Sequence, residues 1–171
     1  MKTGDKVVWL GTSAYAEYTA VPARSAYPIP SGVAPGIAAA SLLQGLTAIT
    51  LTKEAHLVKK DDWVLVHAAA GGVGLWLCQL LKAVGAKTIG TASTDAKIKE
   101  ALDNGATYMV NYKTEKDFVG KIKEITGGEG VIAVFDSTGK DQFDNDLEVL
   151  ARKGSLVSFG NSVSYSPEQR Y

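Results

Sequence analysis

The sequence is poor in the residues that build disulfides and metal sites. Its 171 residues include a single cysteine, which cannot form an internal disulfide, and two histidines. Cys78 is therefore expected to be a small apolar core residue. His56 and His67 add too few ligands for a metal cluster, so we expect no bound metal.

Neither sign of charge is in excess, and long apolar runs are missing. Lys and Arg balance Asp and Glu at 18 each, which gives a net charge of zero and a pI near 6.7. This balance favours neither nucleic acid nor an anionic membrane as a partner. No apolar run approaches the ~20 residues of a membrane span, and the chain opens with no signal peptide. We expect a cytoplasmic protein of about one domain with no membrane partner and no nucleic-acid partner.

A glycine-rich turn between an apolar segment and a helix is the most informative feature present. Gly71 and Gly74 stand at the second and third glycine positions of a G-x-G-x-x-G pattern, and Ala69 stands at the first. An alanine keeps the turn small but does not adopt positive φ freely. Gly71, with Gly72 and Val73 after it, would let the backbone approach a phosphate, and Gly74 would let helix and strand pack closely. The turn predicts a dinucleotide pyrophosphate site; the alternative is a glycine turn without a ligand.

From residue 62 onward, apolar segments alternate with amphipathic ones. The first expected helix shows one apolar stripe, made of Val73, Leu77, Leu80, Leu81 and Val84. Strands are expected at 62–68, 87–92, 108–111, 131–136 and 155–159, and helices at 72–84, 95–104, 115–126 and 141–151. This alternation predicts an α/β fold with a doubly wound parallel sheet of the Rossmann type, with five strands present.

The first part of the chain follows a different pattern. Residues 7–10 and 16–22 are expected as two short strands, 27–30 as an extended connector, and 35–43 and 46–55 as helices broken at Gln44-Gly45. About 30 residues are too few for a domain of their own. Five strands are also one short of two full mononucleotide-binding halves. We expect a piece of a longer protein; a small complete protein is the alternative.

Several short stretches together carry a family resemblance. They are residues 4–7, 15–18, 44–48, 67–74, 136–139 and 158–161. With these stretches the chain resembles the zinc-free, ζ-crystallin-like quinone oxidoreductases of the medium-chain dehydrogenase/reductase superfamily. The resemblance implies that residues 1–30 are the end of a GroES-like substrate domain and that residues 31–171 are an NADP(H)-binding domain truncated at its C-terminus. It also implies a homodimer for full-length relatives, with the state of this chain open.

The zinc-free assignment depends on cysteines that are missing. Zinc alcohol dehydrogenases carry a cysteine-rich loop after the equivalent of Val8 and a cysteine ligand of the catalytic metal near Gln44, as the resemblance implies. Here residues 9–16 bridge the first gap, and no cysteine stands at either place. A Zn²⁺ Lewis-acid mechanism is therefore not expected.

The end of the second expected strand bears on the choice of cofactor. NAD sites usually place Asp or Glu about 20 residues past the glycines, but residues 90–93 contain no acid. The Ser93 hydroxyl, the N–H groups of the next helix and Lys97 could instead bind a 2′-phosphate, which favours NADPH. Asp95 is the competing ribose ligand, although a favourable charge in the first helical turn explains it as well. Lys97 could also be merely a solvated helix residue.

The resemblance implies further cofactor contacts. On the adenosine half these are Tyr112 and Ser137, and on the nicotinamide half Thr47, Thr50, Ser158, Phe159, Gly160 and Asn161. The competing structural roles are a half-buried strand end for Tyr112, a turn former for Ser137 and a loop amide for Asn161.

Other polar residues are given structural roles. His67 is expected to be a hydrogen-bonded core histidine rather than a base, and Asp61-Asp62 a turn before a strand. Tyr112 and Lys116 match the Tyr-x-x-x-Lys spacing of short-chain dehydrogenases, but they follow the third strand rather than the fifth. We name no catalytic side chain.

Together these features predict the cofactor domain of an NADPH-dependent quinone reductase. Metal-free hydride transfer to a quinone or related enone needs alignment and a water-poor pocket more than a protein nucleophile. The alternatives are a 2-alkenal or enoyl reductase of the same superfamily, and a non-catalytic nucleotide- or RNA-binding module.

Overall fold

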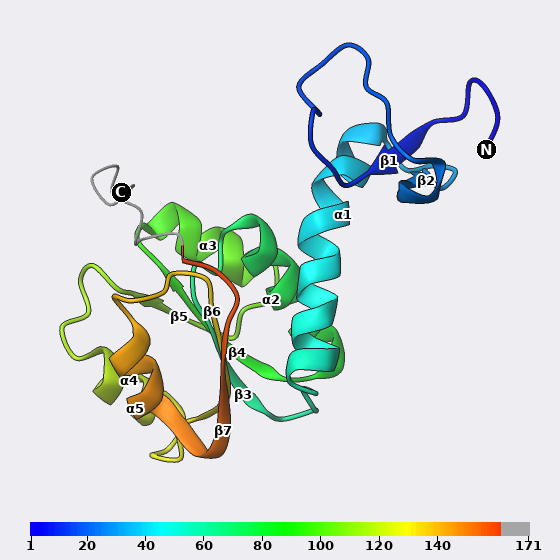
Figure 1. Cartoon of the computed structure of the whole chain (residues 1–171). Helices are drawn as coiled ribbons and strands as arrows, with labels where there is room; N and C mark the ends of the chain where they lie inside the picture. The colour runs from blue at the N-terminus through cyan, green and yellow to red at the C-terminus, as the bar shows by residue number, and fades with distance from the viewer. Residues whose placement is uncertain (162–171) are drawn as a thin grey trace, which may run out of the picture. The chain divides into compact units, whose positions relative to one another are not determined.

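The computed structural model describes residues 1–161 (Figure 1). The chain divides into two compact units, Met1–Thr47 and Ala48–Tyr171, and each is described by itself. The division falls inside helix α1 (Pro35–Thr50).

The N-terminal unit contains a small antiparallel sheet. Strand β1 (Val7–Trp9) pairs with β2 (Ala26–Pro28), which follows the short 3₁₀ helix η1 (Ala23–Ser25). The predicted strand at 16–22 is wrong, and its place is taken by part of the predicted connector 27–30. Tyr15 and Tyr18 are highly exposed and so have no face to cover, whereas Pro28 is tolerated at the end of a two-stranded edge.

Helix α1 runs without interruption through Gln44 and Gly45, so the predicted break is wrong. Gly45 is buried, and a single glycine without a following proline weakens a helix without ending it. After Thr50 the helix widens into the π-helical segment η2 (Leu51–Ala55) and ends at His56, whose backbone is extended.

The helical stretch Pro35–Ala55 also corrects the expectation that nothing approaches the length of a membrane span. Its 21 residues are long and apolar enough to cross a membrane by length and composition, a test that core helices of soluble proteins also pass. The predicted absence of a membrane partner therefore stays a prediction.

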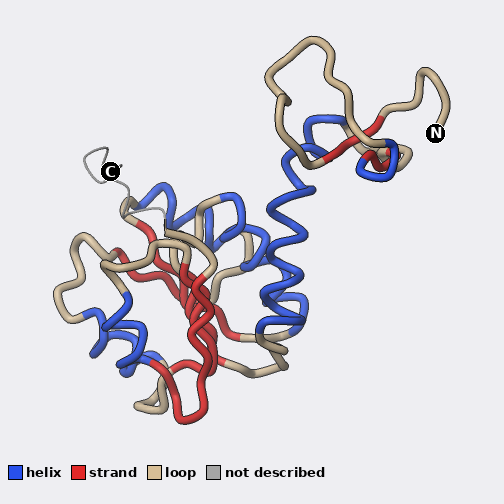
Figure 2. Tube along the Cα trace, in the orientation of Figure 1, coloured by secondary structure: helices blue, strands red, loops and turns tan. Residues whose placement is uncertain are grey.

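The C-terminal unit is built on a five-stranded parallel sheet, drawn in red in Figure 2. The strand order is β5-β4-β3-β6-β7. The strands are β3 (Trp63–Val66), β4 (Lys87–Ala92), β5 (Tyr108–Asn111), β6 (Val131–Asp136) and β7 (Leu150–Ser158). The order reverses direction at β3, which confirms the predicted doubly wound Rossmann topology with five strands.

Helices cover both faces of this sheet (Figure 1). Helices α2 (Gly72–Val84) and α3 (Asp95–Asp103) lie on one face, and α4 (Phe118–Ile125) and α5 (Phe143–Val149) on the other. Alternate residues of β3 serve the two cores: Val64 and Val66 belong to the core with α2, and Leu65 to the core with α4 and α5. Strands buried on both faces explain the nearly continuous apolar runs in the sequence.

Three boundaries differ from prediction. Helix α4 begins only after Asp117, whose side chain caps it by accepting a hydrogen bond from the Gly120 N–H at 2.9 Å. Helix α5 begins after Gln142 and ends at Val149. Strand β7 follows it directly at residues 150–154, which were expected as helix end and loop: Leu150 pairs with Val131, and the pairing with β6 resumes only at Ser155.

Candidate functional site

The turn between β3 and α2 has its left-handed residue one position earlier than the motif suggests. Ala68 has a φ of +49°, whereas Ala69 is fully buried with negative φ. The Ala69 N–H donates to the carbonyl oxygen of Thr91 at 3.0 Å, and the Gly71 N–H donates to that of Ala68 at 2.8 Å. An alanine therefore fits the first motif position, because no positive φ is required there.

The two motif glycines allow close approach of the backbone. A Cβ on Gly74 would collide with the carbonyl oxygens of Ala68 and Ala69, the latter at 2.6 Å. Gly71 is exposed at the N-cap of α2 and provides no side-chain cap. The first N–H groups of α2 thus have no partner within the helix, which is the arrangement that binds anions.

A cavity of about 330 Å³ opens beside this turn at the carboxyl ends of four strands. Ligands bind at this edge of open α/β sheets. Its walls come from the β3–α2 turn (His67, Ala68, Ala70, Gly71), the end of β4 (Thr91, Ala92, Ser93), α3 (Lys97), the end of β5 (Tyr112) and the loop after β6 (Thr138, Asp141, Gln142).

Four of the predicted site residues line this cavity, namely Gly71, Ser93, Lys97 and Tyr112. Gly72, Val73 and Gly74 form the adjoining first turn of α2. Thr47 belongs to the N-terminal unit, where its hydroxyl donates to the carbonyl oxygen of Leu43 at 2.8 Å. Thr50 is exposed at the end of α1.

The other predicted residues gather at the ends of β6 and β7. Ser158 pairs with Asp136, and the Phe159 N–H donates to the Asp136 carbonyl oxygen at 2.9 Å. A Cβ on Gly160 would lie 3.1 Å from the carbonyl oxygen of Ser137. The side chain of Asn161 lies against Gly139. These residues lie together but do not line the cavity.

The end of β4 has the acid-free geometry expected from the sequence. Thr94 is the N-cap of α3, and its hydroxyl accepts from the Lys97 N–H at 3.4 Å. Asp95 lies in the first turn of α3, where its negative charge interacts favourably with the helix dipole. Ser93 and Lys97 therefore flank the start of a helix, on the cavity side.

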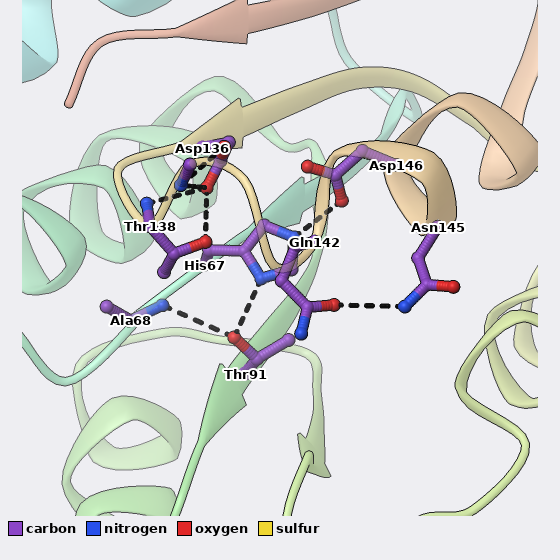
Figure 3. A network of polar contacts seen from close by, with 9 residues as sticks. His67, Ala68, Thr91, Asp136, Thr138, Gln142, Asn145 and Asp146 are labelled. Carbon is purple, nitrogen blue, oxygen red and sulfur yellow. Dashed lines mark hydrogen bonds and ion pairs between the residues drawn. The ribbon is translucent and has the colours of Figure 1, made fainter. Parts of the chain in front are cut away.

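His67 is the centre of a buried polar network (Figure 3). Its Nε2 lies 2.7 Å from Oδ1 of Asp146, and its Nδ1 lies 3.2 Å from Oγ1 of Thr91. The ring stacks on Phe118 and is only 3% exposed. The prediction of a hydrogen-bonded core histidine is confirmed.

Asp146 was missed by sequence reasoning. It lies on α5, is completely buried and leaves Oδ2 without a hydrogen-bond partner among the described residues. Burial raises the pKa of its carboxyl group more than the hydrogen bond from His67 lowers it. The available signal was its position three residues before the core residue Val149, because an acid on a buried helix face requires a partner.

The loop after β6 is shaped by Asp136. Its carboxylate accepts hydrogen bonds from the N–H and hydroxyl of Thr138, at 2.7 and 2.6 Å, and from the N–H of Gly139. This bonding turns Thr138 towards the cavity. Farther along, Gln142 accepts from the side-chain amide of Asn145 at 3.3 Å.

The same carboxylate bears on whether a metal fits. Within residues 1–161, His67, Asp136 and Asp146 are the group whose possible ligand atoms lie within 4.8 Å of one another. Asp136 already binds Thr138 and Gly139, and Nε2 of His67 and Oδ1 of Asp146 already bond to each other at 2.7 Å. These residues do not fit a zinc ion, and the predicted absence of a metal stays a prediction.

The fold and the glycine turn define a Rossmann-type α/β domain. Residues 72–170 match the family model described as zinc-binding dehydrogenase, and the chain belongs to this family. The resemblance to quinone oxidoreductases of the medium-chain dehydrogenase/reductase superfamily is confirmed by the relatives below.

The chain is 45% identical to quinone oxidoreductase 1 of Escherichia coli over 164 residues, which is 95% of this chain and 50% of that protein. It is 47% identical to a probable quinone oxidoreductase of Schizosaccharomyces pombe, covering 94% of this chain and 48% of that protein. The solved E. coli quinone oxidoreductase in complex with NADPH superposes with a TM-score of 0.90 at 45% identity, over 95% of this chain and 50% of that one. The chain thus spans about half the length of the curated relatives it matches.

Proposed function

We propose that this chain is the NADPH-binding part of a quinone reductase that transfers hydride without a metal. The observation that carries the proposal is the continuous cavity wall from Gly71 at the start of α2 to Ser93 and Lys97 at the start of α3. In this proposal the N-terminus of α2 faces the pyrophosphate, and the N-terminus of α3 faces the 2′-phosphate. The relatives that match most of the chain are named quinone oxidoreductases, and one was solved with NADPH.

The residues present fit this cofactor. The N–H groups from Gly72 to Gly74 would bind the pyrophosphate, and no side chain blocks the approach at Gly71 and Gly72. Ser93, Lys97 and Tyr112 would bind the 2′-phosphate, because the strand end lacks the acid that would repel it.

Residues outside the cavity complete the proposal. Ser137 would lie by the adenosine ribose, and Ser158, Phe159, Gly160, Asn161, Thr47 and Thr50 would serve the nicotinamide half. Their support is the resemblance, together with the meeting of the β6 and β7 ends.

When bound, NADPH supplies the hydride that reduces the quinone. The chain's own contribution is to bind the pyrophosphate and the 2′-phosphate, to fix the direction of the dinucleotide across the sheet edge and to exclude water. No side chain of the cavity is required as a proton donor or nucleophile. The names of the relatives do not favour the enal-reductase or the non-catalytic alternative.

Calorimetric titration of the chain with NADPH and NADH tests the cofactor assignment. We expect NADPH to bind about tenfold more tightly, and Lys97→Ala to remove most of that difference. Lys99→Ala is the matched control, because Lys99 is exposed on the same helix and pairs with Asp103. Tighter binding of NADH, or an unaffected Lys97→Ala variant, would overturn the 2′-phosphate assignment.

Steady-state rates of the full-length protein test the substrate class. NADPH oxidation should be faster with 9,10-phenanthrenequinone than with a simple enal. Faster turnover of the enal would replace the quinone by an activated alkene as substrate.

We further propose that residues 1–30 are the end of the substrate domain and that the rest of the chain is the cofactor domain. In this proposal the full-length protein is a cytoplasmic homodimer. Size measurement of the full-length protein by light scattering tests the dimer, and a monomer would contradict it.

A further inference from the structure

A chain of buried polar contacts connects α5 with the phosphate-binding turn (Figure 3). It runs from Oδ1 of Asp146 to Nε2 of His67 at 2.7 Å, and from Nδ1 of His67 to Oγ1 of Thr91 at 3.2 Å. The same Thr91 oxygen accepts from the Ala68 N–H at 3.3 Å. The contacts thereby connect buried residues of α5 and β4 with Ala68, which lies exposed in the turn.

The last member of this chain of contacts is the strained residue of the turn. A left-handed conformation costs a non-glycine residue about 1–2 kcal/mol, and Ala68 adopts it with a φ of +49°. Thr91 supports the turn twice, through its hydroxyl oxygen at the Ala68 N–H and through its carbonyl oxygen at the Ala69 N–H. The shape of the turn therefore depends on how Thr91 is held.

Asp146 is unusual among the acids of its helix. Asp144 and Glu148 are exposed, whereas Asp146 is completely buried and bonds to His67. Burying a carboxyl group is unfavourable unless a partner offsets the loss of hydration. The structure thus retains at this position a group that plain core packing would replace with an apolar one.

We propose that Asp146 is a positioning residue, which acts through His67 and Thr91 to hold the turn in the shape that binds the pyrophosphate of the dinucleotide. The proposal rests on the proposed function. With the carboxylate ionised, the His67 Nε2–H donates to it, and Nδ1 accepts from the Thr91 hydroxyl. A lone pair of Thr91 is then left for the Ala68 N–H, so each donor has one acceptor.

Two probes separate this role from general support of the fold. NADPH contains the pyrophosphate, whereas 2′-AMP carries only the adenosine and the 2′-phosphate that Ser93 and Lys97 would bind. Calorimetry at about pH 8 measures both affinities for Asp146→Ala, Asp146→Asn, Thr91→Val and the Asp146→Ala/Thr91→Val double variant. Asp144→Ala is the matched control on the exposed side of α5.

We expect Asp146→Ala and Thr91→Val each to weaken NADPH about tenfold, because each leaves a buried donor or acceptor unpaired. Asp146→Asn, which keeps an acceptor oxygen, should recover most of the loss. The affinity of each variant for 2′-AMP should stay within about twofold of the parent value. The double variant should lose no more NADPH affinity than whichever single variant loses more.

Additive losses in the double variant, an equal loss of 2′-AMP affinity, or unchanged NADPH affinity would each overturn the proposal. If Asp146→Ala does not fold by circular dichroism, Thr91→Val and Asp146→Asn decide by the same criteria. A parent chain that binds neither probe contradicts the proposed function instead, which is a separate result.

Discussion

Ala69 and Gly90 meet in the core, where Ala69 belongs to the glycine-rich turn between β3 and α2 and Gly90 to strand β4. A Cβ on Gly90 would lie 2.7 Å from the Cβ of Ala69, and it would also collide with the side chain of Met109. The strand-β4 glycine thus makes room for the alanine that replaces the first motif glycine. The two positions are steric complements.

Gly90→Ala should therefore destabilise the chain by about 1–3 kcal/mol through overpacking. Urea unfolding followed by circular dichroism measures this loss. Gly36→Ala is the control, because its new methyl group would meet nothing within 4 Å. A loss at Gly90 no larger than that at Gly36 would contradict the steric pairing.

Glycine substitutions at the two neighbouring alanines should have opposite effects. Ala68→Gly relieves a left-handed alanine and should raise the free energy of unfolding by about 0.5–1 kcal/mol. Ala69→Gly removes a buried methyl group without relieving strain and should lower it by about 1 kcal/mol. Equal destabilisation of both variants in urea would show that Ala68 carries no strain.

The stability of the chain should depend on the protonation of Asp146. Burial raises the pKa of this carboxyl group above its ordinary value of 3.8, so the folded state holds the proton more tightly than the unfolded state. The resulting stabilisation is fully present below 3.8 and is lost as the pH rises through the raised pKa. The Asp146→Asn side chain does not titrate. The free energy of unfolding of this variant should therefore increase relative to that of the parent as the pH rises.

Urea titrations of the two proteins at a series of pH values measure this difference. Asp144→Asn is the matched control, because Asp144 lies exposed on the same helix. A difference that stays constant or shrinks with rising pH would remove the argument for a raised pKa.

The single cysteine should be unreactive in the folded chain. Burial raises the pKa of the Cys78 thiol from 9.0 to about 11, and the thiolate is the reactive form. At neutral pH the native chain should react with a thiol reagent about a hundredfold more slowly than a free thiol, and more slowly still where access is limiting. Unfolding in urea should make this one thiol accessible to the reagent. Equal reaction rates of the native and the unfolded chain would contradict the buried position of Cys78.

The elements of the sheet could be predicted because each carries its own local signal. Strands buried on both faces are apolar throughout, as in Val64 to Val66, and α2 repeats its apolar residues with helical spacing. The parallel order then brings the strand ends to one edge, which is why Gly71, Ser93 and Lys97 could be placed together from the sequence, whereas Tyr112 was predicted from the family resemblance.

The missed features depend on partners distant in sequence or on weak local signals. Asp146 and His67 are 79 positions apart, and no local pattern connects them. Thr138 and Gln142 line the cavity from the loop after β6, where the Asp136 carboxylate accepts hydrogen bonds from Thr138 and Gly139. The pairing of β1 with β2 joins segments of three residues, too short for an alternation pattern to fix the register.

The carboxylate of Asp136 connects the cavity wall with the residues gathered at the ends of β6 and β7. Through Thr138 it shapes the wall of the cavity, and through Gly139 it supports the residue against which Asn161 packs. Loss of the Asp136 carboxylate would therefore remove hydrogen bonds to both Thr138 and Gly139, and so the support of both halves of the candidate site.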